Sequence, residues 1–127
     1  MFTVLVALYA AMSSCSDKGS FVPDYLKFED IIKPNVPSTV ESAGNYTKQI
    51  TGGYLKTTVK YGWLKVADTT EDVCGFLSCP QSGYTVLTRD FSIPSIAPGG
   101  GYTIKLESYD QDEDLIFCFS GSFTLKK

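Results

Sequence analysis

The sequence contains no histidine. This absence excludes serine–histidine and cysteine–histidine catalysis, imidazole general bases and zinc sites that use histidine ligands. Positive charge is also scarce, because 11 Lys and Arg stand against 14 Asp and Glu and give a net charge of −3. A chain with this balance lacks the basic footprint of a nucleic-acid-binding protein, so we expect no nucleic-acid partner. The composition therefore predicts a protein that is not an enzyme and that needs no metal or cofactor.

Long apolar runs are missing as well, since none reaches the length of about 18 residues that a membrane-spanning helix needs. The N-terminus, MFTVLVALYAA, has the length of the hydrophobic region of a signal peptide. Small residues follow it, although no Lys or Arg precedes it. We interpret residues 1–14 as a signal peptide, cleaved at or beside Ser13, and residues 15–127 as one mature domain. A strand or helix buried in the fold is the alternative.

Four cysteines are present, and an even number in so short a chain is typical of a disulfide-braced domain outside the cytosol. They allow three pairings. The short spacing of Cys74 and Cys79 suits a local bridge, which leaves Cys15 to pair with Cys118. Asn45 begins an Asn-Tyr-Thr acceptor for N-linked glycosylation, in a segment that we expect to be a loop. These features predict a secreted or lumenal glycoprotein, with the endolysosomal compartment included.

The mature part shows short alternating runs between clusters of Gly, Pro, Asp and Asn, and no amphipathic helix. This pattern is typical of an all-β sandwich or barrel. We expect one domain of six or seven strands, joined mainly as antiparallel hairpins. The runs cover residues 25–32, 39–43, 54–66, 84–93, 102–109 and 115–125, with a loop over 68–72 and a polar turn over 110–114.

Two charged patterns remain open to a second interpretation. The segment from Asp110 to Asp114 reads D-x-D-x-D, as calcium loops do, but it lacks the Gly and the bidentate Glu of such a loop. We therefore interpret it as a solvated turn. A row of lysines either meets an anionic head group or membrane surface, or protects a sheet edge; these are Lys56, Lys60, Lys65 and Lys105.

A set of motifs stands in a fixed order along the chain: IIKP at 31–34, GY at 53–54, VKYGWL at 59–64, DVC at 72–74, CP at 79–80, IPSIAPG at 93–99 and GY at 101–102. Asp110 and Cys118 follow, with Phe119 and Phe123 behind them. In this order, over residues 15–125, the chain resembles the ML domain family. That family is the lipid-recognition fold of Niemann–Pick type C2 proteins, MD-2, mite group 2 allergens and phosphatidylglycerol/phosphatidylinositol transfer proteins. The short stretch over 37–44 and the lack of an extra early disulfide favour the phospholipid-transfer branch.

The resemblance implies an immunoglobulin-like β-sandwich of two antiparallel sheets, splayed apart to leave a lipid cavity between them. It implies a monomeric carrier of one phospholipid, phosphatidylglycerol- or phosphatidylinositol-like, or of one sterol, with transient contact to a membrane surface. The alternative is a module that presents lipid to a receptor, as MD-2-like relatives do. An adhesive immunoglobulin-like domain without a ligand is a third interpretation.

The alternating strands and the resemblance together indicate which residues line this cavity, although an inward aromatic residue in a sandwich is commonly plain core. The expected lining is Leu55, Val59, Tyr61, Trp63, Val86, Ile104, Leu106, Phe117, Phe119, Phe123 and Leu125. By position in the sterol-binding relatives, the expected entrance is Leu64, Val66, Phe76, Ile93 and Ile96.

Overall fold

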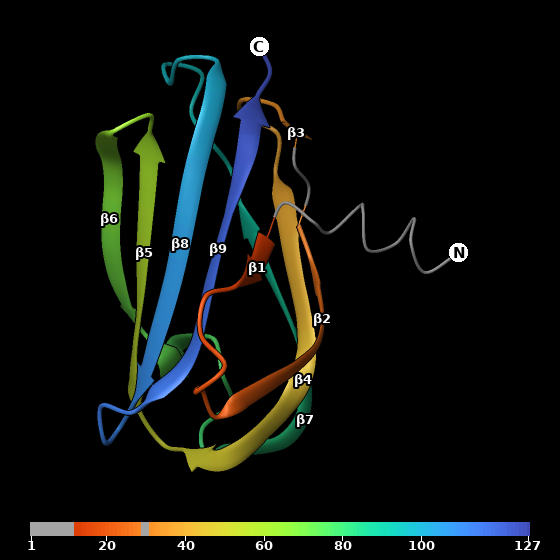
Figure 1. The fold of residues 1–127 in the computed structure, drawn as a ribbon. Helices are drawn as coiled ribbons and strands as arrows, with labels where there is room; N and C mark the ends of the chain where they lie inside the picture. Colours follow the sequence, from red (N-terminus) through yellow and green to blue (C-terminus); the bar gives the residue numbers. More distant parts are fainter. Residues whose placement is uncertain (1–11, 29–30) are drawn as a thin grey trace.

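Two β-sheets pack face to face in the computed structural model, which describes residues 12–28 and 31–127 (Figure 1). The larger sheet has the strand order β1–β9–β8–β5–β6, with β3 also pairing with β9, and the smaller has the order β2–β4–β7. The strands are β1 (Met12–Ser14), β2 (Phe21–Lys27), β3 (Ile31–Ile32), β4 (Ser38–Ile50), β5 (Gly53–Tyr61), β6 (Leu64–Asp72), β7 (Gln81–Phe91), β8 (Gly100–Asp110) and β9 (Leu115–Leu125), and a 3-10 turn, η1, spans Val73–Gly75.

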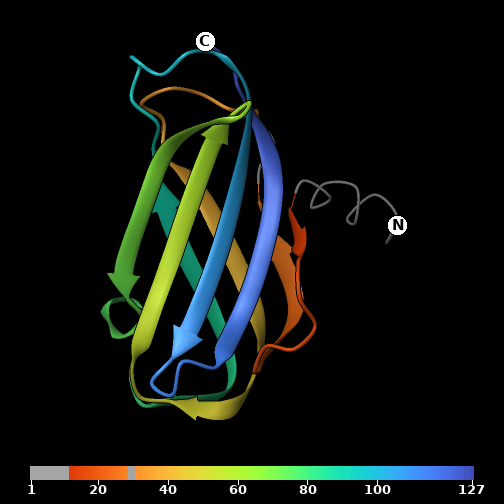
Figure 2. The same cartoon turned by 60° about the vertical axis from the view of Figure 1, so that its left-hand side comes forward.

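The all-β class and the two-sheet sandwich are confirmed, but the described residues form nine strands rather than six or seven. All pairings among them are antiparallel apart from the short one between β3 and β9. The larger sheet lies in front in Figure 2, and the strands of the smaller sheet cross behind it at an angle. The predicted leader lies mostly outside the described residues, although its last three residues, 12–14, form β1 on the edge of β9.

The prediction of one long strand over 54–66 is wrong, because the chain reverses at Gly62 and forms the hairpin of β5 and β6. Gly62 has a φ of +61°, the left-handed value that a tight hairpin turn requires. Tyr61 pairs directly with Leu64, so the turn contains only two residues. The apolar pattern therefore continues through the turn, and the sequence alone does not show where the strand ends. The segment 68–72, predicted as a loop, is the second half of β6. An acidic sequence suits this position because β6 is an edge strand that water reaches.

β4 is also longer than the predicted run over 39–43, and it spans thirteen residues in the middle of the smaller sheet. Small residues weaken its sequence signal. A Cβ atom on Gly44 would lie 2.7 Å from the Phe21 ring, so the close packing of β2 on β4 requires glycine there. Asn45 consequently lies within a strand, not in the expected loop.

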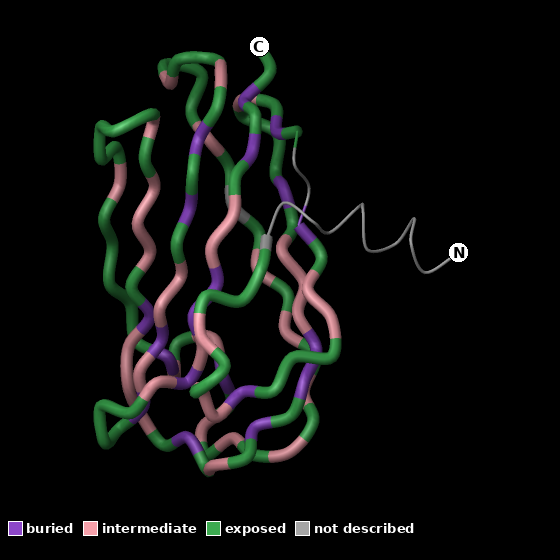
Figure 3. The backbone as a smooth tube through the Cα atoms, in the orientation of Figure 1, coloured by how far each residue is buried: buried purple, intermediate pink, exposed green. Residues whose placement is uncertain are grey.

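The core is densest where β2 and β4 face β8 and β9. The Phe21 ring lies 4.8 Å from that of Tyr46 and meets Phe119 edge-on at 6.5 Å. Tyr102 stacks on Phe123 with 5.2 Å between ring centroids. Figure 3 shows buried positions along β4, β8 and β9, while β6 is exposed over most of its length. The edge strand β6 therefore contributes little to the core.

The two ends of the sandwich differ in composition. We call the upper end the one that carries the β5–β6 turn, β3, the loop over 92–99 and the C-terminus at the top of Figure 1. The lower end carries η1 and the acidic β8–β9 turn. Within the described part of the chain, no helix has the length and apolar character needed to cross a membrane.

Candidate functional site

The inner faces of the two sheets form the candidate site, and most of the predicted lining residues lie there. Five of them are almost fully buried and belong to the packed core: Leu55, Ile104, Phe119, Phe123 and Leu125. Ile104 lies on β8, Phe119, Phe123 and Leu125 lie on β9, and Leu55 lies on β5. These five side chains can contact a ligand only where part of their surface is not covered by other side chains.

A second group faces inward but is only partly buried. Val59 on β5 and Leu106 on β8 pack against the core yet keep part of their surface accessible, as do Tyr61, Phe117 and Leu87. β5 and β8 are internal strands with a neighbour on each side. Because water cannot reach Val59 and Leu106 from a sheet edge, their exposure comes from the space between the sheets.

A charged pair spans the two sheets at their edges. The guanidinium of Arg89 on β7 donates hydrogen bonds of 2.8 Å and 3.0 Å to the two carboxylate oxygens of Glu71 on β6. The same guanidinium lies 4.8 Å from the centre of the Phe76 ring. Both side chains of the pair remain about two-fifths exposed, at 40% and 42%. The pair therefore links the β6 edge of the larger sheet to the β7 edge of the smaller sheet.

Two expected lining residues lie outside the interior. Trp63 occupies the β5–β6 turn and is 89% exposed, because the chain reverses before the expected strand reaches it. Val86 is 54% exposed on β7, where burial alternates strictly and the inward positions are the odd-numbered ones, such as Leu87. The expectation for Trp63 extended the alternation of one strand through a turn. The expectation for Val86 chose the inward face of its strand without knowing the partner strands.

Four of the five expected entrance residues lie at the upper end. Leu64 and Val66 begin β6, and Ile93 and Ile96 belong to the facing loop between β7 and β8. The Tyr61 hydroxyl donates a 3.1 Å hydrogen bond to the carbonyl of Gly99 and so ties this loop to the hairpin. Phe76 does not join them, because it follows η1 at the opposite end of β6.

The acidic turn holds a feature that the sequence did not reveal. The Nζ atom of Lys48, from β4, lies 3.0 Å, 2.9 Å and 3.0 Å from carboxylate oxygens of Asp110, Asp112 and Asp114. The side chain of Asp110 is fully buried, so the turn is not solvated throughout as predicted. An ammonium group from the smaller sheet therefore occupies the centre of the D-x-D-x-D cluster of the larger one. The only sequence signal was a lone lysine in a polar segment, 62 residues away.

Both disulfides that the cysteine spacing favours are present, Cys15–Cys118 and Cys74–Cys79. The first bridge closes a sequence separation of 103 residues and attaches the segment after β1 to β9. Its two residues are also joined by a 2.9 Å backbone hydrogen bond from the Cys15 amide to the Cys118 carbonyl.

Asn45 is exposed on the outer face of the smaller sheet, between Val22 of β2 and Tyr84 of β7. A glycan at this position would stand away from the interior. We predict that the protein from a secretory host carries an N-linked glycan here, detected as a mass that an endoglycosidase reduces. Asn45→Gln should abolish the extra mass, and Thr47→Ser, which keeps the acceptor triplet, should retain it. An unmodified wild-type mass would contradict the prediction.

This geometry defines a class of protein: an immunoglobulin-like β-sandwich with disulfide braces and with inward apolar residues that are only partly buried. The family model described as the ML domain matches residues 10–125, and the chain belongs to this family. The resemblance read from the motifs is thereby confirmed.

Among curated proteins, the chain is similar to fungal proteins named phosphatidylglycerol/phosphatidylinositol transfer protein. It is 30% identical to the one from Neurospora crassa over 106 residues, which is 74% of this chain and 60% of that protein. It is 32% identical to the one from Emericella nidulans over 108 residues, which is 75% of this chain and 64% of that protein. The chain thus spans about three-fifths of the length of these relatives.

Two solved structures share the fold. A Niemann-Pick type C2 protein from Japanese carpenter ant superposes with a TM-score of 0.73 at 11% identity, over 91% of this chain and 98% of that one. Chicken MD-1, crystallised in complex with lipid IVa, superposes with a TM-score of 0.58 at 17% identity, over 91% and 87%. At these identities the likeness extends to the arrangement of the two sheets.

Proposed function

We propose that this chain binds one phospholipid or sterol between its two sheets and carries it between membranes. The observation that carries the proposal is the partial exposure of inward apolar residues on internal strands, Val59 and Leu106 above all. A lipid that covers them removes apolar area from water at about 25 cal/mol per Å². Binding and release require no covalent step, which agrees with a sequence that has no histidine. The names of the fungal relatives support a phospholipid such as phosphatidylglycerol or phosphatidylinositol.

The upper end supplies a surface for contact with a bilayer. Of the large apolar side chains that are exposed in the described residues, most gather there: Ile31, Val36, Trp63, Leu64, Val66 and Ile96. Trp63 and Ile96 are 89% and 88% exposed. Tryptophan favours the membrane–water interface, where its ring is apolar and its N–H meets water. We place lipid exchange at this end, between the β5–β6 hairpin and the loop over 92–99.

We infer the compartment from the cysteines. All four are in disulfides, and disulfides persist in oxidising surroundings. This supports an extracellular or lumenal protein, and we propose secretion or an endolysosomal location, with the protein acting as a monomer.

The direct test is extraction of the purified protein followed by mass spectrometry of the extract, together with uptake of fluorescent phospholipid and sterol. We expect one lipid per chain and transfer of that lipid between two vesicle populations. A protein with no extracted lipid and no uptake would refute the proposal. A lipid that is bound but never transferred would favour presentation to a receptor over transport.

Leu106→Trp tests where the ligand binds. If the space between the sheets is open, the larger ring occupies it, displaces about two methylene groups of the lipid and lowers uptake roughly tenfold. The melting temperature should then change little. In a closed interior the same change would overpack the core and cost about 1–3 kcal/mol of stability. Val86→Trp, on the exposed outer face of β7, is the matched control and should leave uptake unchanged.

A further inference from the structure

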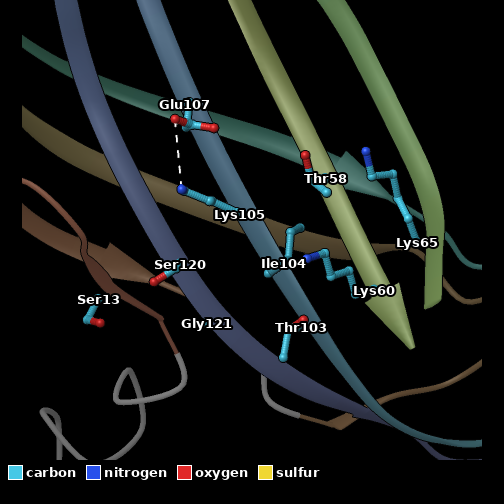
Figure 4. Close-up of a pocket in the computed structure, with 10 residues that line it drawn as sticks. All are labelled: Ser13, Thr58, Lys60, Lys65, Thr103, Ile104, Lys105, Glu107, Ser120 and Gly121. Atoms are coloured by element: carbon cyan, nitrogen blue, oxygen red, sulfur yellow. Dashed lines mark ion pairs between the residues drawn. The ribbon is translucent and has the colours of Figure 1, made fainter. Parts of the chain in front are cut away.

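A groove of about 570 Å³ lies on the outer face of the larger sheet, on the opposite side from the inward apolar residues. Figure 4 shows the polar side chains that line it, which come from β1, β5, β6, β8 and β9. We call it the lysine groove and define it by Thr58, Lys60, Lys65, Thr103, Lys105 and Ser120. The full lining combines three ammonium groups and four hydroxyl groups, including that of Ser13, with the carboxylate of Glu107.

The arrangement of the three lysines is costly for the fold itself. Lys60 and Lys65 are direct cross-strand partners in the β5–β6 hairpin. Lys105 pairs with Thr58, two residues before Lys60, and so lies diagonal to Lys60 on the same face. Side chains directly opposite one another stand about 5 Å apart at Cβ, and like charges in that position destabilise a sheet.

Nearby carboxylates only partly offset this charge. The ammonium of Lys65 lies 3.3 Å from Asp68, and that of Lys105 lies 3.9 Å from Glu107. Lys60 makes no ion pair or side-chain hydrogen bond with any residue of 12–28 or 31–127. The groove therefore keeps an excess of positive charge in a chain whose net charge is −3. Such a local excess is complementary to an anion.

The place of the groove indicates where the anion comes from. Lys60 and Lys65 flank the turn that carries the exposed Trp63. With a rise of about 3.3 Å per residue, their backbone lies within about 7–10 Å of the tip of that turn. When the upper end touches a bilayer, Trp63 reaches the interfacial layer and the lysines reach the level of the lipid phosphates.

We infer that the lysine groove binds the phosphate groups of anionic phospholipids in a bilayer surface, separately from the ligand site between the sheets. This inference rests on the proposed lipid carrier and adds a preference for the membranes on which it docks. Each lysine near an anionic surface strengthens attachment about fivefold, and salt screens the effect.

The test is co-sedimentation of the full chain with vesicles of phosphatidylcholine alone or with phosphatidylglycerol added. We expect tighter binding to the anionic vesicles, weakened at high salt. Lys60→Gln with Lys105→Gln should reduce binding to the anionic vesicles about 25-fold. The control, Lys18→Gln with Lys27→Gln, removes the same charge elsewhere on the surface and should reduce it far less. Because Lys60→Gln also relieves a like-charge pair, the melting temperature should not fall.

Three results would overturn the inference: equal binding by the wild type and the groove variant, equal loss in the control variant, or release from anionic vesicles by millimolar inorganic phosphate. The last would mean that the groove takes a free phosphate. Uptake of fluorescent lipid from solution is measured on the same variants and should be unchanged. Failure of the wild type to take up lipid would refute the proposed carrier, whereas loss of the vesicle preference alone would refute only the role of the groove.

Discussion

Replacement of both Cys15 and Cys118 with alanine is expected to lower the free energy of unfolding by about 4–5 kcal/mol. The bridge spans 103 residues, so in the chain-entropy treatment it removes a large part of the freedom of the unfolded chain. Domains of this size commonly have about 5–15 kcal/mol in total, and the loss corresponds to a fall in melting temperature of roughly 15 °C. Urea unfolding followed by circular dichroism measures it.

Cys74→Ala with Cys79→Ala is the matched control. That bridge spans 5 residues, and the same treatment gives it about 2 kcal/mol. A loss at the short bridge equal to or greater than that at the long one would contradict the chain-entropy explanation. Reduction of the wild type should reproduce the sum of the two effects, because the bridges lie in different parts of the fold.

Asp110→Ala is expected to have the second large effect, about 3 kcal/mol of destabilisation. The buried Asp110 carboxylate accepts hydrogen bonds of 2.8 Å and 3.1 Å from the amides of Asp112 and Asp114, and it lies 3.0 Å from the Lys48 ammonium. Its removal leaves two backbone donors without their acceptor and deprives the β4 lysine of its buried partner. Equilibrium unfolding in urea at pH 7 measures the loss.

Asp112→Ala provides the comparison for this cluster. Its carboxylate also contacts Lys48, at 2.9 Å, but its side chain is 61% exposed. Exposed ion pairs contribute about 0–1 kcal/mol, so this variant should stay close to the wild type. Equal destabilisation by both variants would show that the burial of Asp110 does not decide its contribution.

The pH dependence of stability has a definite sign at this cluster. Burial raises the pKa of Asp110, but the hydrogen bonds from Lys48 and from the two backbone amides outweigh burial and hold the pKa below its usual value. A carboxyl whose folded pKa is depressed stabilises the fold above its unfolded pKa of about 3.9 and loses that contribution as pH falls through the folded pKa. We expect the Asp110 contribution to be constant between pH 7 and pH 5 and to decline below about pH 4. Unfolding of Asp110→Ala should lack this acid-side decline.

Single strands could be predicted from the alternation of apolar and polar residues, because each strand buries one face and exposes the other. The prediction of residues 115–125 as one strand matches β9, where Phe119, Phe123 and Leu125 share one buried face. The hairpin of β5 and β6 could not be predicted from the sequence, because a two-residue turn preserves the alternation of apolar and polar residues. Only the positive φ of Gly62 in the structure shows the turn. The same limit explains Trp63 and Val86. A period of two identifies two faces but does not say which of them meets the other sheet.

Composition and strand alternation by themselves predicted a disulfide-braced all-β domain without histidine, because these properties are carried by residue types and local spacing. The resemblance of the motif order to the ML family implied the sandwich. Only the tertiary structure decided which apolar residues stay accessible between the sheets, that Lys48 fills the acidic turn, and that Lys60, Lys65 and Lys105 share one groove. The reason is physical: burial and charge pairing depend on strand register and sheet packing, which bring together residues far apart in the chain.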